Sequence, residues 1–219
     1  METIDLTFAY ENGQRAGNPA RHPTVSLRAM GTIEKDGLNT SSILVGTHTG
    51  THMDAPRHFV ADGATIDQMD ISICIGDVTV VNFFHKKKGS CVTEEDVQCL
   101  TIKPRMLFVF GWSRYYGTDT YQSDWPYFSV DAVRFLAERG VKLILMDTPS
   151  PDPQAGVLAE DFPVHKQMLS RGFPTFVETL ANTEQIDFQK TYYVAALPLK
   201  VKGLDGAPCR VVLIENSTT

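Results

Sequence analysis

The alternation of apolar and polar positions predicts a chain built mainly from β-strands. Residues 4–8 alternate apolar and polar side chains, which is typical of a half-buried strand. Nearly continuous apolar runs at 105–110 and 141–146 indicate strands buried on both faces. Further runs rich in β-branched and aromatic residues, of strand length, occur at 24–29, 43–45, 73–84, 173–177, 192–197 and 209–214.

Helices are expected to be few and short. Thr93, followed three residues later by Asp96, resembles a capping box and predicts a helix that ends near residue 100. Ser129 can cap a second helix, which ends before Gly140. A third short helix is expected at 165–171, stopped by Gly172.

The order of these elements predicts a mixed α/β fold. Several strands follow one another directly, with a hairpin turn at 203–206, and the helices are scattered, so the order is not that of a Rossmann fold. No linker rich in Pro, Gly or Ser divides the chain, and we expect one domain over 1–219. The loops at 8–23 and 111–128 are long enough to shape a binding site.

Composition narrows the possible functions. The chain has 219 residues and a net charge of -6, and its one basic cluster, at 86–88, has no interleaved aromatic residues, which argues against a nucleic-acid partner. No apolar run approaches the length of a membrane span, and no leader pattern opens the sequence. The four cysteines form no C-x-x-C pair. We therefore expect a cytoplasmic protein without a membrane partner.

The densest polar chemistry lies between His48 and His58. Three imidazoles and the carboxylate of Asp54 occupy eleven residues, and such groups are costly to bury without hydrogen-bond partners or a metal. His52 and Asp54, two residues apart, point to the same side of an extended chain, and Gly50 can provide the turn that returns His48 to them. Nitrogen and oxygen donors without thiolate suit Zn²⁺, Mn²⁺ or Fe²⁺.

Three protein ligands with an open position are typical of a catalytic metal that activates water. His58 can then act as the general acid/base, because an imidazole gains and loses protons near neutral pH. His165 and Glu178 lie at predicted element ends, where a site role and an ordinary surface role are equally open. Ordinary structural roles are favoured for the other candidates considered, His22, His85 and Asp147.

The run 48–59 resembles the H-x-G-T-H-x-D-x-P-x-H-F signature of the cyclase-like metal-dependent hydrolases, the group of bacterial kynurenine formamidase and isatin hydrolase. Similarity to the family continues at 111–114 and 147–150, at His165 and Glu178, and at 197–200 with 203–206. The resemblance implies a swivelling β/β/α domain with a mixed sheet and short helices. It also implies a homo-oligomer, either a homodimer or a homotetramer.

The resemblance further implies one or two divalent ions, Zn or Mn, and assigns the proton transfer to His58. The implied metal ligands are His48, His52, Asp54, His165 and Glu178. One departure is the interval from His165 to Glu178, which is one residue longer than the family pattern and leaves the number of ions open. Family members present an aromatic residue from the N-terminal loop to the substrate, and the candidates here are Phe8 and Tyr10, with Trp112 from the 111–114 segment.

The leading functional hypothesis is hydrolysis of a non-peptide C–N bond in a small amide. An N-formyl aryl amine such as N-formylkynurenine, from tryptophan catabolism, and a cyclic amide such as isatin are both open as substrates. One alternative is a non-catalytic metal- or ligand-binding protein on the same fold. Another is a lyase or ring-closing enzyme, because a polarised carbonyl serves those reactions as well.

Overall fold

Seven strands close into a mixed β-barrel in the computed structural model, which describes residues 2–16, 20–170 and 175–216. Around the barrel the strands are β12 (Gly206–Glu215), β11 (Tyr192–Pro198), β5 (Ile75–Asn82), β7 (Arg105–Val109), β9 (Leu143–Met146), β10 (Thr175–Glu178) and β4 (His52–Asp54). β4 pairs back with β12 and closes the ring, and β1 (Thr3–Asp5) adds to the outer edge of β12. The expected mixed α/β class is confirmed.

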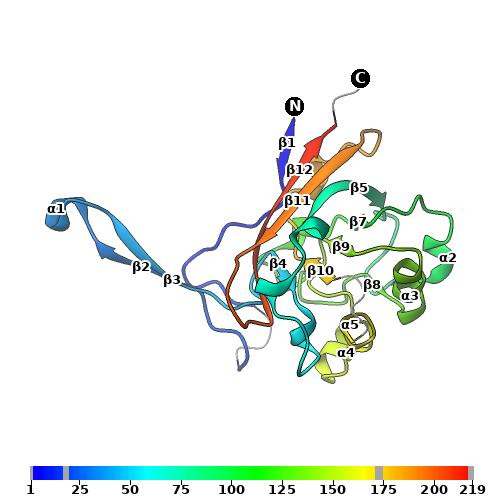
Figure 1. Cartoon of the computed structure of the whole chain (residues 1–219), viewed down its shortest axis with the longest axis horizontal. Helices are drawn as coiled ribbons and strands as arrows, with labels where there is room; N and C mark the ends of the chain where they lie inside the picture. The colour runs from blue at the N-terminus through cyan, green and yellow to red at the C-terminus, as the bar shows by residue number, and fades with distance from the viewer. Residues whose placement is uncertain (1, 17–19, 171–174, 217–219) are drawn as a thin grey trace.

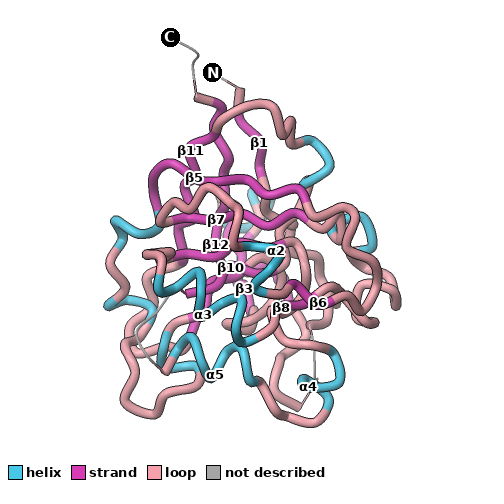
Figure 2. Tube along the Cα trace, turned by 90° about the vertical axis from the view of Figure 1, so that its right-hand side faces the viewer, coloured by secondary structure: helices cyan, strands magenta, loops and turns pink. Residues whose placement is uncertain are grey.

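The barrel divides into a parallel and an antiparallel part. β5, β7, β9 and β10 run parallel, whereas β4, β12 and β11 pair antiparallel to their neighbours. The helices α2 (Glu94–Val97), α3 (Val130–Glu138), α4 (Gln154–Leu158) and α5 (Pro163–Leu169) lie beside the parallel strands (Figures 1 and 2). Single 3-10 turns occur at Pro56–His58, Ile66–Gln68, Ile71–Cys74, Ser113–Tyr115 and Thr183–Gln185.

Two apolar cores follow from the period of two along the parallel strands. Leu107 and Val109 of β7 join the core inside the barrel, and Met106 and Phe108 join the core beneath the helices. Both faces of β7 are therefore buried, which explains the continuous apolar run in its sequence. Among the described residues, no helix is long and apolar enough to cross a lipid bilayer.

The predicted helix starts are confirmed at two positions. Ser129 Oγ accepts the N–H of Ala132 at 3.1 Å, and Thr93 forms both bonds of the capping box with Asp96. The segment predicted as one strand at 73–84 begins instead as a 3-10 turn, because Asp70 caps it by accepting the N–H of Ser72. The predicted helix end and strand start at 171–174 lie outside the described residues.

Short elements depart from the sequence prediction in two further places. The segment 111–128 contains a 3-10 turn and β8 (Tyr127–Phe128), which pairs with β6 (Cys91–Val92). β2 (Ser26–Gly31) and β3 (Thr40–Leu44) pair with each other alone, with α1 (Ile33–Asp36) between them. These last elements form an arm that projects from the body of the molecule (Figure 1).

Candidate metal centre

β4 carries part of the cluster into the wall of the barrel. His52 stands directly opposite Glu178 of β10, and Asp54 stands opposite Gly206 of β12. Directly paired residues of antiparallel strands share a face, as do residues two apart, so His52, Asp54 and Glu178 lie on one side of the sheet. All three side chains are buried.

A turn at Gly50 returns His48 to β4. Gly50 has φ +64°, in the left-handed region that glycine adopts without strain, and His48 Nδ1 lies 2.8 Å from Asp54 Oδ1. The carbonyl of Gly50 lies 2.8 Å from His52 Nδ1 and accepts its proton. The other nitrogen of His52 is thereby left with a lone pair directed at the carboxylates. The tight turn expected at Gly50 is therefore present.

The candidate ligand atoms of β4 and β10 converge. His52 Nε2 lies 3.5 Å from both Asp54 Oδ1 and Glu178 Oε2, and the three ligand atoms all fall within 4.8 Å of one another. The second group that could hold an ion combines His48, Asp54 and His58 within the same limit. Asp54 is common to both groups and could bridge two ions.

α5 supplies His165 from the other side of the centre. His165 Nε2 lies 3.1 Å from Asp54 Oδ2 and 3.1 Å from Glu178 Oε1, and its Nδ1 lies 2.5 Å from Asp152 Oδ2. Asp152 also accepts the N–H of Val164 at 2.6 Å and so fixes the start of the helix. A carboxylate behind a histidine is the usual arrangement that orients a metal ligand.

The donor set fits a divalent cation. Glu178 Oε1 is buried and, within the described part of the chain, accepts no hydrogen bond, although it lies 3.1 Å from His165 Nε2. A buried carboxylate oxygen without a donor is costly unless a cation binds it. His52, His165, Asp54 and Glu178 therefore present nitrogen and oxygen lone pairs of the kind that zinc and manganese bind.

The pKa values show how strongly the carboxylates attract positive charge. Burial lowers the pKa of His48, but hydrogen bonds with Asp205 and Asp54 outweigh it and raise the pKa to about 9. Burial likewise opposes the shift at His165, whose hydrogen bonds with Asp152 and Asp54 hold its pKa well above the ordinary value. A cation bound at the centre would supply the same positive charge and displace those protons.

His58 lies at the more open side of the centre. Its ring stacks on that of His48 with 3.8 Å between centroids, and its Nδ1 lies 3.5 Å from Asp205 Oδ2. Asp205, which directly precedes β12, also contacts His48 Nε2 at 2.8 Å. Hydrogen bonds from His48 and His58 lower the pKa of the Asp205 carboxyl, so Asp205 holds both rings as an anion.

The structure adds residues that sequence reasoning missed. Asp152 and Asp205 contact the cluster from 94 and 147 residues downstream of His58 respectively, and no spacing rule connects them to it. The ring of His22, for which the sequence favours an ordinary structural role, lies 6.3 Å from that of His48 between centroids, and His22 belongs to neither candidate metal group among the described residues. Phe59, the last residue of the signature run, packs on the rings of His58 and His165.

The three residues expected to contact substrate lie in different surroundings. Tyr10 donates to the carbonyl of Thr49 at 2.8 Å, directly beside the cluster. Phe8 stacks on Tyr116 with 3.6 Å between centroids, which joins the N-terminal loop to the 111–128 segment. Trp112 is buried, and its indole N–H donates to the carbonyl of Tyr121, so its contact with substrate stays a prediction.

Asp147 has a structural role, as its position before a turn suggested. Its carboxylate accepts the N–H groups of Phe110 and Trp112 at 2.9 and 2.8 Å, and the hydroxyl of Thr183 at 2.9 Å. These bonds join the ends of β7 and β9 to the segment after β10. Asp147 therefore stabilises the edge of the barrel on which Glu178 lies.

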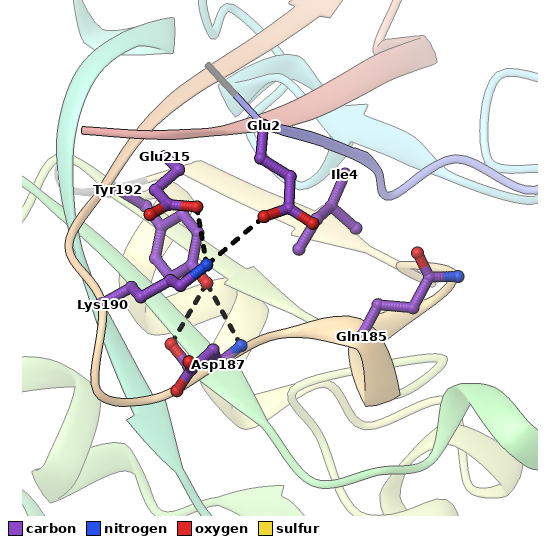
Figure 3. Close-up of a pocket in the computed structure, with 7 residues that line it drawn as sticks. All are labelled: Glu2, Ile4, Gln185, Asp187, Lys190, Tyr192 and Glu215. Carbon is purple, nitrogen blue, oxygen red and sulfur yellow. Dashed lines mark hydrogen bonds and ion pairs between the residues drawn. The ribbon is translucent and has the colours of Figure 1, made fainter. Parts of the chain in front are cut away.

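A separate small pocket lies beside the N-terminal strand (Figure 3). Lys190 Nζ contacts Glu215 Oε2 at 2.8 Å and Glu2 Oε2 at 3.3 Å there, and the Tyr192 hydroxyl bonds to the backbone of Asp187. None of its lining residues belongs to the candidate metal centre. Its contacts between Lys190, Glu2 and Glu215 join β1, β12 and the segment before β11, so we assign it a structural role.

The fold and the site together indicate the class of protein: a mixed β-barrel that carries a candidate metal centre of buried His, Asp and Glu side chains. The Cyclase family model matches residues 4–153, and the chain belongs to this family. A kynurenine formamidase of Erythrobacter litoralis is 31% identical over 182 residues, which are 83% of this chain and 80% of the relative. A kynurenine formamidase of Geobacillus thermodenitrificans is 28% identical over 180 residues, or 82% of each chain.

A solved structure confirms the relation at the level of the fold. An isatin hydrolase bound to the product analogue thioisatinate superimposes with a TM-score of 0.84 at 21% identity, covering 98% of this chain and 93% of that one. The family recognised from the 48–59 signature is therefore confirmed. The chain is homologous to kynurenine formamidases and shares the fold of isatin hydrolase.

Proposed function

We propose that this protein is a metal-dependent hydrolase that cleaves the C–N bond of a small, non-peptide amide. The observation that carries the proposal is the convergence of His52, Asp54, Glu178 and His165, where Glu178 Oε1 accepts no hydrogen bond from the described residues. The two formamidase relatives support an N-formyl aryl amine as substrate, with N-formylkynurenine first. A cyclic amide such as isatin is the second candidate.

The residues divide into those that hold the ion and those that move protons. His48, His52 and Asp54, completed by His165 and Glu178, would hold the cation. A divalent ion such as Zn²⁺ or Mn²⁺ in such a site polarises a carbonyl and lowers the pKa of water. Asp152 orients His165 through the hydrogen bond to its Nδ1.

His58 would carry the proton between water and the leaving nitrogen. Water adds across the amide bond: its oxygen goes to the carbonyl carbon, and one proton goes to the nitrogen as the C–N bond breaks. His58 is only partly buried and lies beside His48, so it can face both the water and the leaving nitrogen, and its Nδ1 lies 3.5 Å from Asp205 Oδ2. Phe8 and Tyr10 would contact the aryl group of the substrate.

The test is to strip the protein with a chelator, restore Zn²⁺ or Mn²⁺, and assay N-formylkynurenine and isatin side by side. We expect activity to vanish on stripping and to return with the ion. We expect His58→Ala to reduce kcat by about 10²- to 10⁴-fold with substrate affinity little changed. His85→Ala, an exposed histidine that packs on Phe83, is the matched control and should keep full activity.

Each rival function predicts a different result. A non-catalytic binding protein would take up the ion and turn over neither amide. A lyase or ring-closing enzyme would form product without taking oxygen from solvent, whereas hydrolysis in ¹⁸O-labelled water places the label in the acid product. Full activity after exhaustive chelation would remove the metal from the mechanism.

A further inference from the structure

The side chain of Thr51 connects the two strands that carry His52 and Glu178. Thr51 directly precedes β4, and Thr179 directly follows β10. The hydroxyl of Thr51 donates to the carbonyl of Thr179 at 2.6 Å, and both residues are buried. Neither threonine belongs to the groups of described residues that could hold an ion. This hydrogen bond therefore lies one residue away from a candidate metal ligand on each strand.

The bond takes the place of the next step in the ladder between β4 and β10. The antiparallel register places His52 opposite Glu178, and the next residues along the two strands are Thr51 and Thr179. Thr179 has φ +60°, in the left-handed region, and so departs from the extended conformation of a strand. The hydroxyl of Thr51 gives the carbonyl of Thr179 a donor at the point where the ladder ends.

The conformation of Thr179 requires support from its surroundings. A β-branched residue rarely adopts a positive φ, and such a conformation persists where neighbouring contacts fix it. The N–H of Thr179 donates to the carbonyl of Thr148 at 3.1 Å, and its carbonyl accepts the hydroxyl of Thr51. These two bonds hold the turn that directly follows Glu178. Loss of the hydroxyl would remove one of them and loosen the backbone beside Glu178.

The hydroxyl of Thr51 also holds the start of the N-terminal loop. It accepts the N–H of Phe8 at 3.1 Å, so the same oxygen donates on one side and accepts on the other. Two residues earlier in the chain, the carbonyl of Leu6 accepts the N–H of Ala181 at 2.9 Å. The chain before the loop therefore lies against the segment that follows Glu178. One buried hydroxyl joins this segment to Phe8, a residue expected to contact substrate.

We propose that Thr51 is a positioning residue whose hydroxyl fixes Glu178 in the metal centre and ties the chain at Phe8 to it. The proposal deepens the proposed function and rests on it for the ion that Glu178 would hold. Valine has the shape of threonine but neither donates nor accepts a hydrogen bond. Thr51→Val would leave the carbonyl of Thr179 and the N–H of Phe8 without this partner, and a buried polar group in that state is costly.

The first test measures the affinity of the full chain for Zn²⁺ by competition with a chromophoric chelator. Thr51→Val should weaken Zn²⁺ binding by about 10-fold or more, as is typical when a group that orients a metal ligand is lost. Thr51→Ser keeps the hydroxyl and should bind Zn²⁺ within about threefold of the wild type. Thr79→Val on β5 is the matched control. The hydroxyl of Thr79 donates to the carbonyl of Thr101 at 2.8 Å, so the control loses the same kind of bond away from the centre and should keep the wild-type affinity.

Hydrogen exchange of the wild-type protein tests the same connection without any substitution. Zn²⁺ should slow exchange of the Phe8 amide by about threefold or more, although Phe8 offers no ligand atom, because the Thr51 hydroxyl couples that amide to the centre. The amide of Ala132 is the control, since it too is accepted by a hydroxyl, that of Ser129 at 3.1 Å. Exchange of the control amide should change by less than about twofold.

Each result decides between positioning and a purely structural role. Zn²⁺ binding by Thr51→Val at the wild-type affinity would overturn the proposal, and so would an equal loss of affinity in Thr51→Ser or in Thr79→Val. Exchange at Phe8 that does not respond to Zn²⁺ would overturn the coupling even if Thr51→Val failed to fold. A wild-type protein that binds Zn²⁺ but hydrolyses neither amide would refute the proposed function and leave the positioning role of Thr51 standing.

Discussion

Replacing Asp152 with asparagine should weaken metal binding even though Asp152 would not touch the ion. Asp152 is fully buried and uses its two carboxylate oxygens in different ways. Oδ1 accepts the N–H of Val164 at 2.6 Å, and Oδ2 lies 2.5 Å from His165 Nδ1. Both neighbours are donors, so both oxygens must be acceptors. An asparagine has the same shape but only one acceptor oxygen.

The single oxygen of the asparagine cannot serve both donors. If it keeps the N–H of Val164, the amide group of the asparagine faces His165 Nδ1 and donates to it. The proton of the imidazole then moves to Nε2, the atom that lies 3.1 Å from Asp54 Oδ2, and the lone pair needed for a metal is lost. Loss of such a partner behind a metal-binding histidine typically costs about 10- to 100-fold in metal affinity.

Competition with a chromophoric chelator measures this affinity directly, without reference to any substrate. Asp161→Asn is a matched control, because Asp161 is exposed, lies just before α5 and pairs at 3.1 Å with Lys166 of that helix, which also carries His165. The control should bind the ion as the wild type does. If Asp152→Asn bound the ion within about twofold of the wild type, the tautomer of His165 would not depend on Asp152 and the reasoning would fail.

Two further substitutions test the local structure by urea unfolding. Gly50→Ala places a methyl group at φ +64° and 3.1 Å from the Tyr10 ring, so we expect the free energy of unfolding to fall by about 1–2 kcal/mol; an unchanged midpoint would show that the turn is not held at this φ. Ser129→Ala removes the cap of α3 and should cost about 1 kcal/mol, whereas Ser129→Thr, which keeps the hydroxyl, should cost less.

Local signals in the sequence are sufficient to predict much of the candidate metal centre. The density of histidines between His48 and His58 marked the site, and the spacing of His52 and Asp54 placed both on one face of a strand. The sequence also predicts the caps at Thr93 and Ser129, because each cap depends on a residue three positions away. Such local preferences are retained in the folded protein because the tertiary contacts favour the same conformation.

The other features of the centre depend on the pairing of strands that are far apart in the sequence. Asp205 joins His48 and His58 only because β12 pairs with β4 and returns to close the barrel, which no local pattern encodes. The arm is a second case in which the local sequence pattern does not predict the tertiary packing. Residues 24–29 and 43–45 are predicted as strands, and in the described part of the chain β2 and β3 pair only with each other. Val25, just before β2, is buried and bonds to the backbone of residues 13 and 14, whereas Leu27, Ile43 and Leu44 stay exposed.

The longer interval between His165 and Glu178 does not decide how many ions bind. Each end is held by contacts outside the interval, His165 by Asp152 and Glu178 by its register with His52 on β4, so we expect the additional residue to leave both ligand atoms in place. The donor set is therefore the better guide to the number of ions.

Asp54 belongs to two candidate groups, one with His52 and Glu178 and the other with His48 and His58. A second ion would make His58 a ligand and leave it no lone pair for protons, so the two roles exclude each other. Metal analysis of His58→Ala separates them. If His58 moves protons, the variant keeps the metal content of the wild type and loses turnover. If His58 is a ligand, the variant loses one ion for each chain, and the proton role proposed for it is wrong.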